Sequence, residues 1–443
     1  MTGQSDELIE FCVALSLDDI SSDARDHARL SLLNAIGVTL GGQEDEATQI
    51  ATRQAEFLGG NPQAHIFGTP QMTSVDRAGL INGISSHVLD FDDTHLPTVY
   101  HPTAPLMASV VPLAEYLDVS GEKFLCAWTV GLEGGIRLAC ALGRPHYDHG
   151  WHVTSTAGYV AAALACSILL GLDTTRTRHA VGIAATQSSG HRQQFGAMTK
   201  SFHAGMAGSG GLLAALLASD GYTANNDSVS GRRGLLSVMS PDPDPSALTS
   251  GLGENWVLLE NCLKPYASGV VTHPLIDAGR LLGHVHEVDA EDITGLTLQV
   301  NPLVMELTNI ENPSTGLEAK FSVRHCFAVG FLDNGGGPAQ FSNERVAAGD
   351  IVSLRDRISV EGGDLPHMHA RVHVNLTDGN QFEIEVHDAR GTMARPLTTI
   401  EVRKKYFSLA NPAIGEIRAR SIHDAVFEIE ERSFNDLVPV DLN

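Results

Sequence analysis

Apolar residues recur every three or four positions through residues 5 to about 262, a spacing that predicts α-helices. Capping residues and glycines indicate where some of these helices begin and end. Ser21-Ser22-Asp23 predicts the start of a helix that ends at Gly41-Gly42, and Ser74-Val75-Asp76 opens another. Further helices are predicted over residues 106–117, 121–142, 155–172, 173–185 and 204–219. The last of these is rich in Gly and Ala, which predicts a close approach of neighbouring helices.

The pattern of the chain changes after about residue 262. Residues 295–300 alternate between apolar and polar, and residues 370–376 and 382–386 bracket Asp378-Gly379, which is a hairpin signal. Helical spacing returns over residues 397–406 and 414–433. The predicted fold is therefore mainly α, with a large all-helical domain (1–264), a smaller α+β lid domain (265–395) and a C-terminal segment (396–443) that returns to the helical domain.

Composition narrows the class of protein. The 443 residues are 43% hydrophobic and 19% charged, as in soluble globular proteins. A net charge of −24 argues against nucleic acid and anionic membrane partners, because both need a basic surface. The six cysteines are widely spaced, so we expect neither a metal cluster nor a disulfide framework. The start of the chain has no basic, apolar leader, and the apolar run at 157–172 is shorter than a spanning helix. We expect a cytoplasmic protein.

Titratable side chains are concentrated directly after the predicted helix that Ser74 opens. The segment Leu89-Asp90-Phe91-Asp92-Asp93-Thr94-His95 is followed by His101-Pro102. Such groups are costly to desolvate at the end of a buried helix, so a fold usually retains them for chemistry. The three aspartates also suit a second interpretation, in which they cap the next helix. Both interpretations stay open at this point.

Four further segments carry candidate residues. His152 and Thr154 stand between a glycine turn and a Ser/Thr-rich helix start, where free N–H groups favour an anion. Lys200 and His203 are three positions apart and share one face of a helix. The other two segments are Lys264-Pro265-Tyr266 with Thr272-His273-Pro274, and residues 318–325. Each residue taken alone also suits an ordinary structural role.

Together these residues predict a cationic pocket in an acidic protein. Two lysines, three histidines (His101, His152 and His273) and the aspartate cluster would line it. Such a pocket suits a di- or tricarboxylate that loses a proton or a carboxylate, because both reactions add negative charge to an anion. Histidine can give or take the proton at neutral pH.

Several of these motifs, in the same order along the chain, resemble the MmgE/PrpD family. This family includes 2-methylcitrate dehydratase, cis-aconitate decarboxylase and iminodisuccinate epimerase. The resemblance implies a helical domain, an α+β lid, a cofactor-free site between them and a homodimer. It places the family's active-site residues on Asp90, Thr94, His101, His152, Lys200 and Lys264. The motifs are Asp90-Phe-Asp-Asp-Thr94 with His101-Pro102, Gly150-Trp-His152 with Thr154-Ser-Thr156, Phe195-Gly196 with Thr199-Lys200, His203 and Gly205, Lys264-Pro-Tyr266 with His273, and Ala319-Lys-Phe-Ser322.

The short gap between Thr94 and His101 resembles the gap found in the decarboxylase and epimerase branch of that family. His325 is a departure, because the decarboxylase branch carries at this position a tyrosine thought to take part in catalysis. The cysteine often found after the Lys264 motif is also absent, and residues 267–269 are Ala, Ser and Gly. These differences leave the outcome of the reaction open.

The predicted function is that of a cofactor-independent, metal-free lyase acting on a small polycarboxylate. Lys200, Lys264 and His273 would bind carboxylates together with Thr154, and His152 and His101 would exchange protons. Asp90 and Thr94 would orient these histidines, and His325 completes the predicted catalytic set.

Three alternatives to this function are open. One is an epimerase of an iminodisuccinate-like dicarboxylate, which returns the proton to the opposite face. Another is a metal-dependent hydrolase, and the last is an inactive protein that binds a carboxylate. The hydrolase would use Asp90, Asp92, Asp93, His95 and His101.

Overall fold

The computed structural model describes residues 3–439 and divides them into two compact units. The helical unit contains the described residues up to 88, residues 92–261 and residues 399–439. The second unit contains Leu89–Phe91 and Cys262–Thr398. The chain thus enters the second unit twice, first for only three residues.

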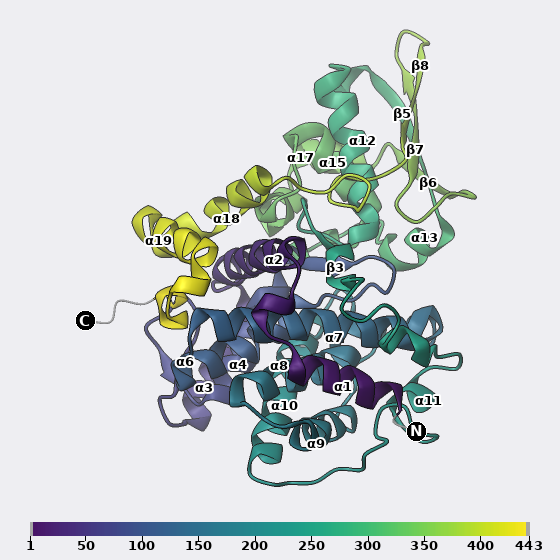
Figure 1. Cartoon of the computed structure of the whole chain (residues 1–443). Helices are drawn as coiled ribbons and strands as arrows, with labels where there is room; N and C mark the ends of the chain where they lie inside the picture. Colours follow the sequence, from purple (N-terminus) through teal and green to yellow (C-terminus); the bar gives the residue numbers. More distant parts are fainter. Residues whose placement is uncertain (1–2, 440–443) are drawn as a thin grey trace. The chain divides into compact units, whose positions relative to one another are not determined.

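Helices form almost all of the regular structure of the helical unit (Figure 1). A short antiparallel pair, β1 and β2, and the short strand β3 are added to them. The elements are α1 (Gln4–Ala14), α2 (Ser22–Gly41), α3 (Glu46–Leu58), β1 (Ala64–His65), β2 (Met72–Thr73), α4 (Val75–Val88), β3 (Asp93–His95), α5 (Thr103–Met107), α6 (Val110–Leu117), α7 (Gly121–Asp148), α8 (Val153–Leu170), α9 (Thr174–Ala185), α10 (Thr199–Ser219), α11 (Leu235–Met239), α18 (Thr399–Ile414) and α19 (Glu416–Phe427).

The second unit combines a four-stranded sheet with short helices. The strand order is β6-β5-β7-β8; β5 and β6 are parallel, and the other neighbours are antiparallel. The predicted hairpin is confirmed, because β7 and β8 pair around Asp378-Gly379. Its elements are β5 (Ile293–Val300), β6 (Ile358–Gly362), β7 (Ala370–Leu376), β8 (Gln381–Val386), α12 (His273–Arg280), α13 (Pro302–Thr308), α14 (Gly316–Ala319), α15 (Val323–Asp333), α16 (Asn343–Val346) and α17 (Gly349–Arg355), while β4 (Asn261–Leu263) spans the junction.

The structure confirms a mainly α fold with a smaller α+β part. Local capping explains the start of α2, where Oγ of Ser21 accepts a hydrogen bond from the N–H of Ala24 at 3.3 Å. The prediction of one helix over 106–117 is wrong, because the chain breaks at Ala108–Ser109 into α5 and α6. Pro112 has no N–H to bond the carbonyl of Ala108, and its ring crowds that carbonyl.

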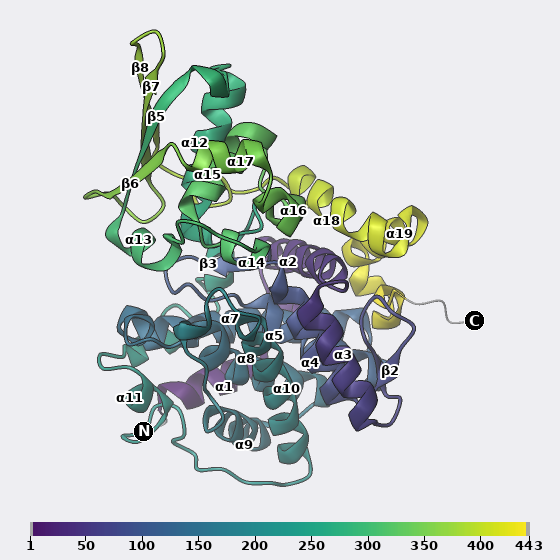
Figure 2. The same cartoon turned by 180° about the vertical axis from the view of Figure 1, so that it is seen from behind.

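The small residues of α10 allow close helix packing, as predicted. A Cβ added to Gly205 would lie 2.4 Å from the carbonyl oxygen of Leu80 on α4, and one added to Gly208 would lie 2.3 Å from Pro105 on α5. Figure 2 shows α3, α4 and α10 side by side. These three helices line an apolar cavity of about 740 Å³, with Phe202 and Leu213 of α10 on its wall.

Three helices are long and apolar enough to cross a membrane by length and composition: α7, α8 and α10. Within each helix, the most apolar stretch is 94%, 89% and 67% buried, respectively, inside the protein. The sequence analysis compared only residues 157–172 with the length of a membrane-spanning helix, and it did not consider α7 or α10. Packing of α8 against α7 and α10 accounts for their apolar composition within the fold.

Candidate active site

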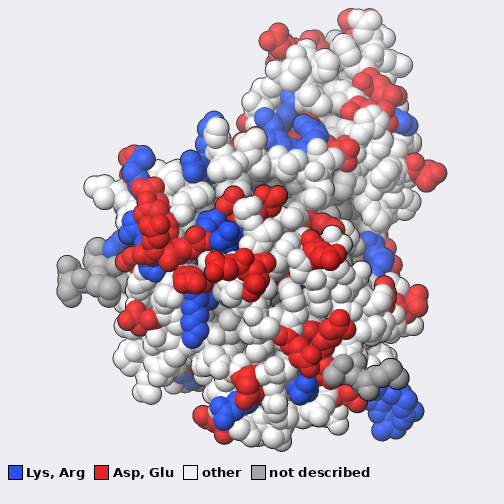
Figure 3. Space-filling model, in the orientation of Figure 1, with Lys and Arg blue, Asp and Glu red and all other residues white. Residues whose placement is uncertain are grey.

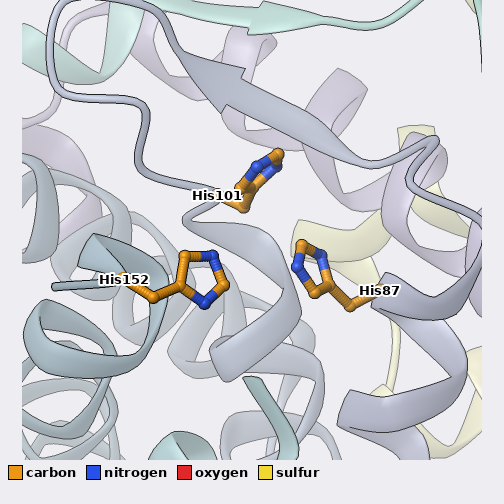
Figure 4. A group of neighbouring side chains, drawn as sticks. All are labelled: His87, His101 and His152. Carbon is orange, nitrogen blue, oxygen red and sulfur yellow. The ribbon is translucent and has the colours of Figure 1, made fainter. Parts of the chain in front are cut away.

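Three buried histidines converge inside the helical unit (Figure 4). The ring centroids of His87 and His101 lie 4.8 Å apart, and His152 lies 5.8 Å from the first and 6.4 Å from the second. None of the three is more than 4% exposed. His101 and His152 were predicted from the sequence, but His87 was not. The sequence signal that could have identified His87 is its position three residues before Asp90, at the end of a predicted buried helix.

His87 ends α4 and is paired with an aspartate. Its Nδ1 lies 2.7 Å from Oδ2 of Asp92. A carboxylate accepts hydrogen bonds, so Nδ1 of His87 donates, and this contact orients the ring. Asp92 therefore holds a histidine of the cluster.

His101 follows β3 and is held through its own Nδ1. This atom lies 2.8 Å from the carbonyl oxygen of Asp93 and 3.1 Å from Oγ1 of Thr94. A carbonyl oxygen only accepts, so Nδ1 of His101 carries a proton. Oγ1 of Thr154 accepts a hydrogen bond from the backbone N–H of His101 at 3.2 Å. Thr94 and Thr154 thus both contact the candidate catalytic histidine.

His152 is the N-cap residue of α8, but its side chain does not cap the helix. Its Nδ1 lies 3.0 Å from Nδ1 of His203 on α10. Its Nε2 is buried and makes no hydrogen bond with any residue that the structure describes. Burial is the largest cause that lowers the pKa of His152 well below its usual value, and the positive charge of Lys200 acts in the same direction. The imidazole is therefore neutral at neutral pH, with one nitrogen directed at no protein partner in the described chain.

Lys200 adds a buried positive charge beside this cluster. It is 7% exposed, and its Nζ lies 5.6 Å from the ring centroid of Phe195, whose edge contacts His152 at a centroid distance of 5.2 Å. Figure 3 shows groups of acidic side chains on the surface of this protein of net charge −24. The cluster around Lys200 is thus a local exception, and its chemistry suits an anionic ligand.

The three imidazoles have the ligand chemistry of a metal site. One nitrogen from each of His87, His101 and His152 lies within 4.8 Å of the others. Nδ1 of His87 and of His101 is bonded to oxygen, as in many metal-binding histidines. Lys200 opposes this use, since its positive charge already disfavours a second cation beside His152. The arrangement fits an anion better than a metal ion.

Two residues of the alternative hydrolase set, Asp93 and His95, make contacts within the fold. Asp93 accepts hydrogen bonds from the backbone N–H and the hydroxyl of Thr103, where α5 begins. The N-cap residue of α5 is Pro102, without a side-chain cap, so Asp93 contacts the start of this helix but is not its N-cap residue. Burial and the charge of Asp92 raise the pKa of Asp93 to about 6. Nδ1 of His95 lies 2.8 Å from Oγ1 of Thr98. Asp93 and His95 therefore serve contacts inside the fold.

We expect activity to survive removal of metal ions, because protein side chains supply both the cation and the proton-exchanging groups. The test is an assay after dialysis against EDTA, beside an undialysed sample. Loss of turnover that a divalent ion restores would contradict this expectation and favour the hydrolase.

Buried neutral histidines make the stability of the helical unit dependent on pH. Burial lowers the pKa of His146 on α7 to about 4, and the same effect lowers that of His203 to about 4. The unfolded chain binds more protons than the folded chain between pH 6.5 and 4, so stability is lost as the pH falls through this range. From pH 7 to 5 each histidine should cost about 2 kcal/mol, at about 1.4 kcal/mol per pKa unit. Asp93 opposes this loss below pH 6, because its folded pKa is raised.

Urea unfolding at pH 7 and pH 5 measures this effect. His146→Gln should reduce the difference between the two pH values, because one group that titrates on unfolding is removed. An equal difference in the variant and the parent would contradict the assignment.

The second unit contains a buried ion pair between Lys264 and Asp90. The sequence predicted both as site residues but did not predict that they contact each other. Nζ of Lys264 lies 2.6 Å from Oδ1 of Asp90, 2.9 Å from the carbonyl oxygen of Asp90 and 3.0 Å from that of Ser268. The two charged side chains are 1% and 5% exposed. An ammonium has three N–H donors, so these contacts occupy all of them. Lys264 therefore holds Asp90 in its left-handed backbone conformation (φ 51°), and a carboxylate ligand must displace one contact.

His273 lies beside this pair at the start of α12. Its Nε2 is 3.4 Å from the carbonyl oxygen of Ser268, which Lys264 also contacts. The ring of Tyr266 packs edge-on against it, with centroids 5.3 Å apart. The hydroxyl of Tyr266 is in turn bonded to Asp277. The segment after Lys264 is thus built to bring the predicted Lys264 and His273 together.

His325 lies elsewhere in the second unit, within α15. It is 0% exposed, its Nε2 lies 2.8 Å from the carbonyl oxygen of Gln340, and its ring packs against Phe341. Burial lowers its pKa to about 4. The buried ring therefore stays neutral at neutral pH, and the catalytic role given to His325 stays a prediction.

Family models match both parts of the chain. The MmgE/PrpD N-terminal domain matches residues 6–248, and the MmgE/PrpD C-terminal domain matches residues 266–430. The chain belongs to the MmgE/PrpD family. The C-terminal model extends beyond Thr398 into α18 and α19, which the contacts of the structure assign to the helical unit.

Curated relatives in the family are named as decarboxylases. The chain is 27% identical to the cis-aconitate decarboxylase-like protein oryM of Aspergillus oryzae, over 96% of this chain and 94% of that protein. It is 26% identical to a cis-aconitate decarboxylase of Aspergillus terreus (99% and 95% covered). It is 25% identical to the human cis-aconitate decarboxylase (90% and 86% covered). The family and these relatives support a lyase of the dehydratase or decarboxylase type.

Proposed function

We propose that this protein is a lyase that acts, without a metal or organic cofactor, on a small di- or tricarboxylate. It removes CO₂ or water by moving a proton at a carbon next to a carboxylate. The observation that carries this proposal is the buried cluster of three imidazoles, with a neutral His152, beside Lys200. We further propose a cytoplasmic homodimer that binds neither nucleic acid nor membranes.

The cluster has the parts that this chemistry needs. Loss of CO₂ or of a proton leaves electrons on the carbon, and the adjacent carboxylate shares the added negative charge. A buried cation such as Lys200 lowers the energy of that charge more than a solvated one would. Like any neutral imidazole, His152 has one ring nitrogen free of a proton and one that carries it, and His101 is a second ring of the same chemistry. His152 can therefore exchange a proton with the substrate without first changing charge.

A screen of citrate-, aconitate- and aspartate-derived acids by proton NMR tests the proposal. We expect at least one acid to lose CO₂ or water in the presence of the full chain, and the His152→Gln variant to be much slower. A screen in which no acid changes, or in which a dicarboxylate only epimerises, would contradict the lyase and in the second case favour the epimerase.

His325 gives a prediction about substrate choice. We expect cis-aconitate to be a poor substrate of the unmodified protein, because a neutral buried imidazole stands where the decarboxylase branch carries a tyrosine. His325→Tyr should change the product pattern and not merely the rate. Rapid itaconate formation by the unmodified protein would contradict this prediction.

A further inference from the structure

His152 and His203 share a hydrogen bond whose chemistry goes beyond binding a carboxylate. Their Nδ1 atoms are 3.0 Å apart, and their rings are tilted by 49° at a centroid distance of 5.2 Å. A neutral imidazole has one donor and one acceptor nitrogen, so a bond between two Nδ1 atoms holds one proton. We propose that His203 relays protons between solvent and His152 during the proposed lyase reaction, on which this inference rests.

Both rings are neutral in the resting protein. Burial is the main cause that lowers the pKa of each ring. Positive charge at Lys200 and His87 lowers both pKa values further. His101 also faces His152, and His191 also faces His203. The pair therefore carries two ring protons at neutral pH, one in the shared bond and one on an outer Nε2.

The two outer nitrogens face different surroundings. Nε2 of His152 is buried and has no hydrogen-bond partner in the described chain, so it is available to a bound ligand. His203 keeps 7% of its surface exposed, and the exposed His191 lies on its outer side. Nε2 of His152 thus lies inside the fold, and His203 is the ring of the pair that keeps some exposed surface.

The backbone at Gly190 packs closely against His152 and His203. Its carbonyl oxygen accepts a hydrogen bond from the N–H of His152 at 3.1 Å. A Cβ at Gly190 would lie 2.7 Å from Oγ of Ser155 and 3.3 Å from Cδ2 of His203, and its φ of 97° favours glycine. This close cover leaves little space for water between the rings, so the direct bond is the available route for a proton.

The step moves one proton from solvent to carbon and leaves both rings neutral. The Nε2–H bond of His152 breaks as a C–H bond forms on the carbon that has lost CO₂. The Nδ1 proton of His203 passes to Nδ1 of His152, and Nε2 of His203 takes a proton from water. After the product leaves, water protonates Nε2 of His152, its Nδ1 proton returns to His203, and Nε2 of His203 releases its proton.

Nitrogen NMR of ¹⁵N-histidine-labelled full chain tests the shared proton without any substrate. In the parent protein at pH 7, we expect both rings to be neutral, with the Nδ1 signal of His152 shifted toward a shared position. His203→Asn places an amide near the position of Nδ1 and should move that signal. A His152 signal that is unchanged in the variant would overturn the shared bond.

Turnover of the acid that the proton NMR screen identifies as a substrate tests the relay itself in the same variant. An Asn amide can hydrogen-bond to His152 but cannot pass a proton on, so His203→Asn should lower kcat about 10²-fold or more. The calorimetric Kd of a dicarboxylate inhibitor should stay within about threefold, and added imidazole should restore part of kcat. The matched control His149→Asn, at an exposed position after α7, should leave kcat unchanged. Unchanged kcat in His203→Asn, or a loss that imidazole does not reverse, would overturn the relay. Absence of turnover in the parent would instead contradict the proposed function, and the NMR result would stand apart from it.

Discussion

Replacing His152 with Gln is expected to lower kcat by about 10²–10⁴-fold, the usual contribution of a group that exchanges protons. The binding of a dicarboxylate inhibitor should be nearly unchanged, because the neutral imidazole contributes no charge to it. The pKa of His152 lies well below its usual value, which is the physical basis for this neutrality. The measurement is kcat beside a calorimetric Kd for the inhibitor.

Lys200→Ala is the contrasting variant. It removes a charge-assisted contact worth about 1.5–3 kcal/mol, so both affinity and turnover should fall. The assignment of roles is wrong if His152→Gln abolishes binding but retains turnover at saturation. It is also wrong if Lys200→Ala changes neither quantity.

Lys264→Met is expected to destabilise the second unit by about 3–5 kcal/mol, because it removes the ammonium that neutralises the buried carboxylate of Asp90. The pair is almost fully buried, with side-chain exposures of 1% and 5%. The double variant Lys264→Met with Asp90→Asn removes both charges and should recover much of the loss. Urea unfolding of the full chain measures both variants.

An exposed ion pair supplies the control for that experiment. Arg420 and Glu416 on α19 are 66% and 75% exposed, and breaking such a pair costs at most about 1 kcal/mol. Arg420→Met should therefore have little effect. If Lys264→Met is as mild as this control, the buried pair does not have the structural role assigned to it here.

Elements set by local signals were predictable from the sequence. The cap at Ser21 and the hairpin turn at Asp378-Gly379 depend on a few neighbouring residues, and both occur as predicted. The break before α6 depends on Pro112 acting within a run that otherwise has helical spacing. An apolar pattern alone does not show such an interruption.

For the active-site candidates too, residues in local motifs were predictable, whereas contacts that depend on the fold were not. His101, His152 and Lys200 stand in recognisable motifs, and the structure places them in one buried cluster with Thr94. His203 was a candidate residue, but its contact with His152 was not predicted, because α8 and α10 approach each other only in the folded chain. The neutral state of His325 was missed for a similar reason, since its pKa depends on burial.

The most direct test of the account is deuterium incorporation by the full chain in D₂O, after dialysis against EDTA. The account predicts that an acid of the screen loses CO₂ or water and that solvent deuterium enters at the carbon next to a carboxylate. His152→Gln should slow this incorporation in proportion to turnover. A product that forms with no solvent hydrogen exchanged at that carbon, or a protein that acts only once a divalent ion is restored, would contradict it.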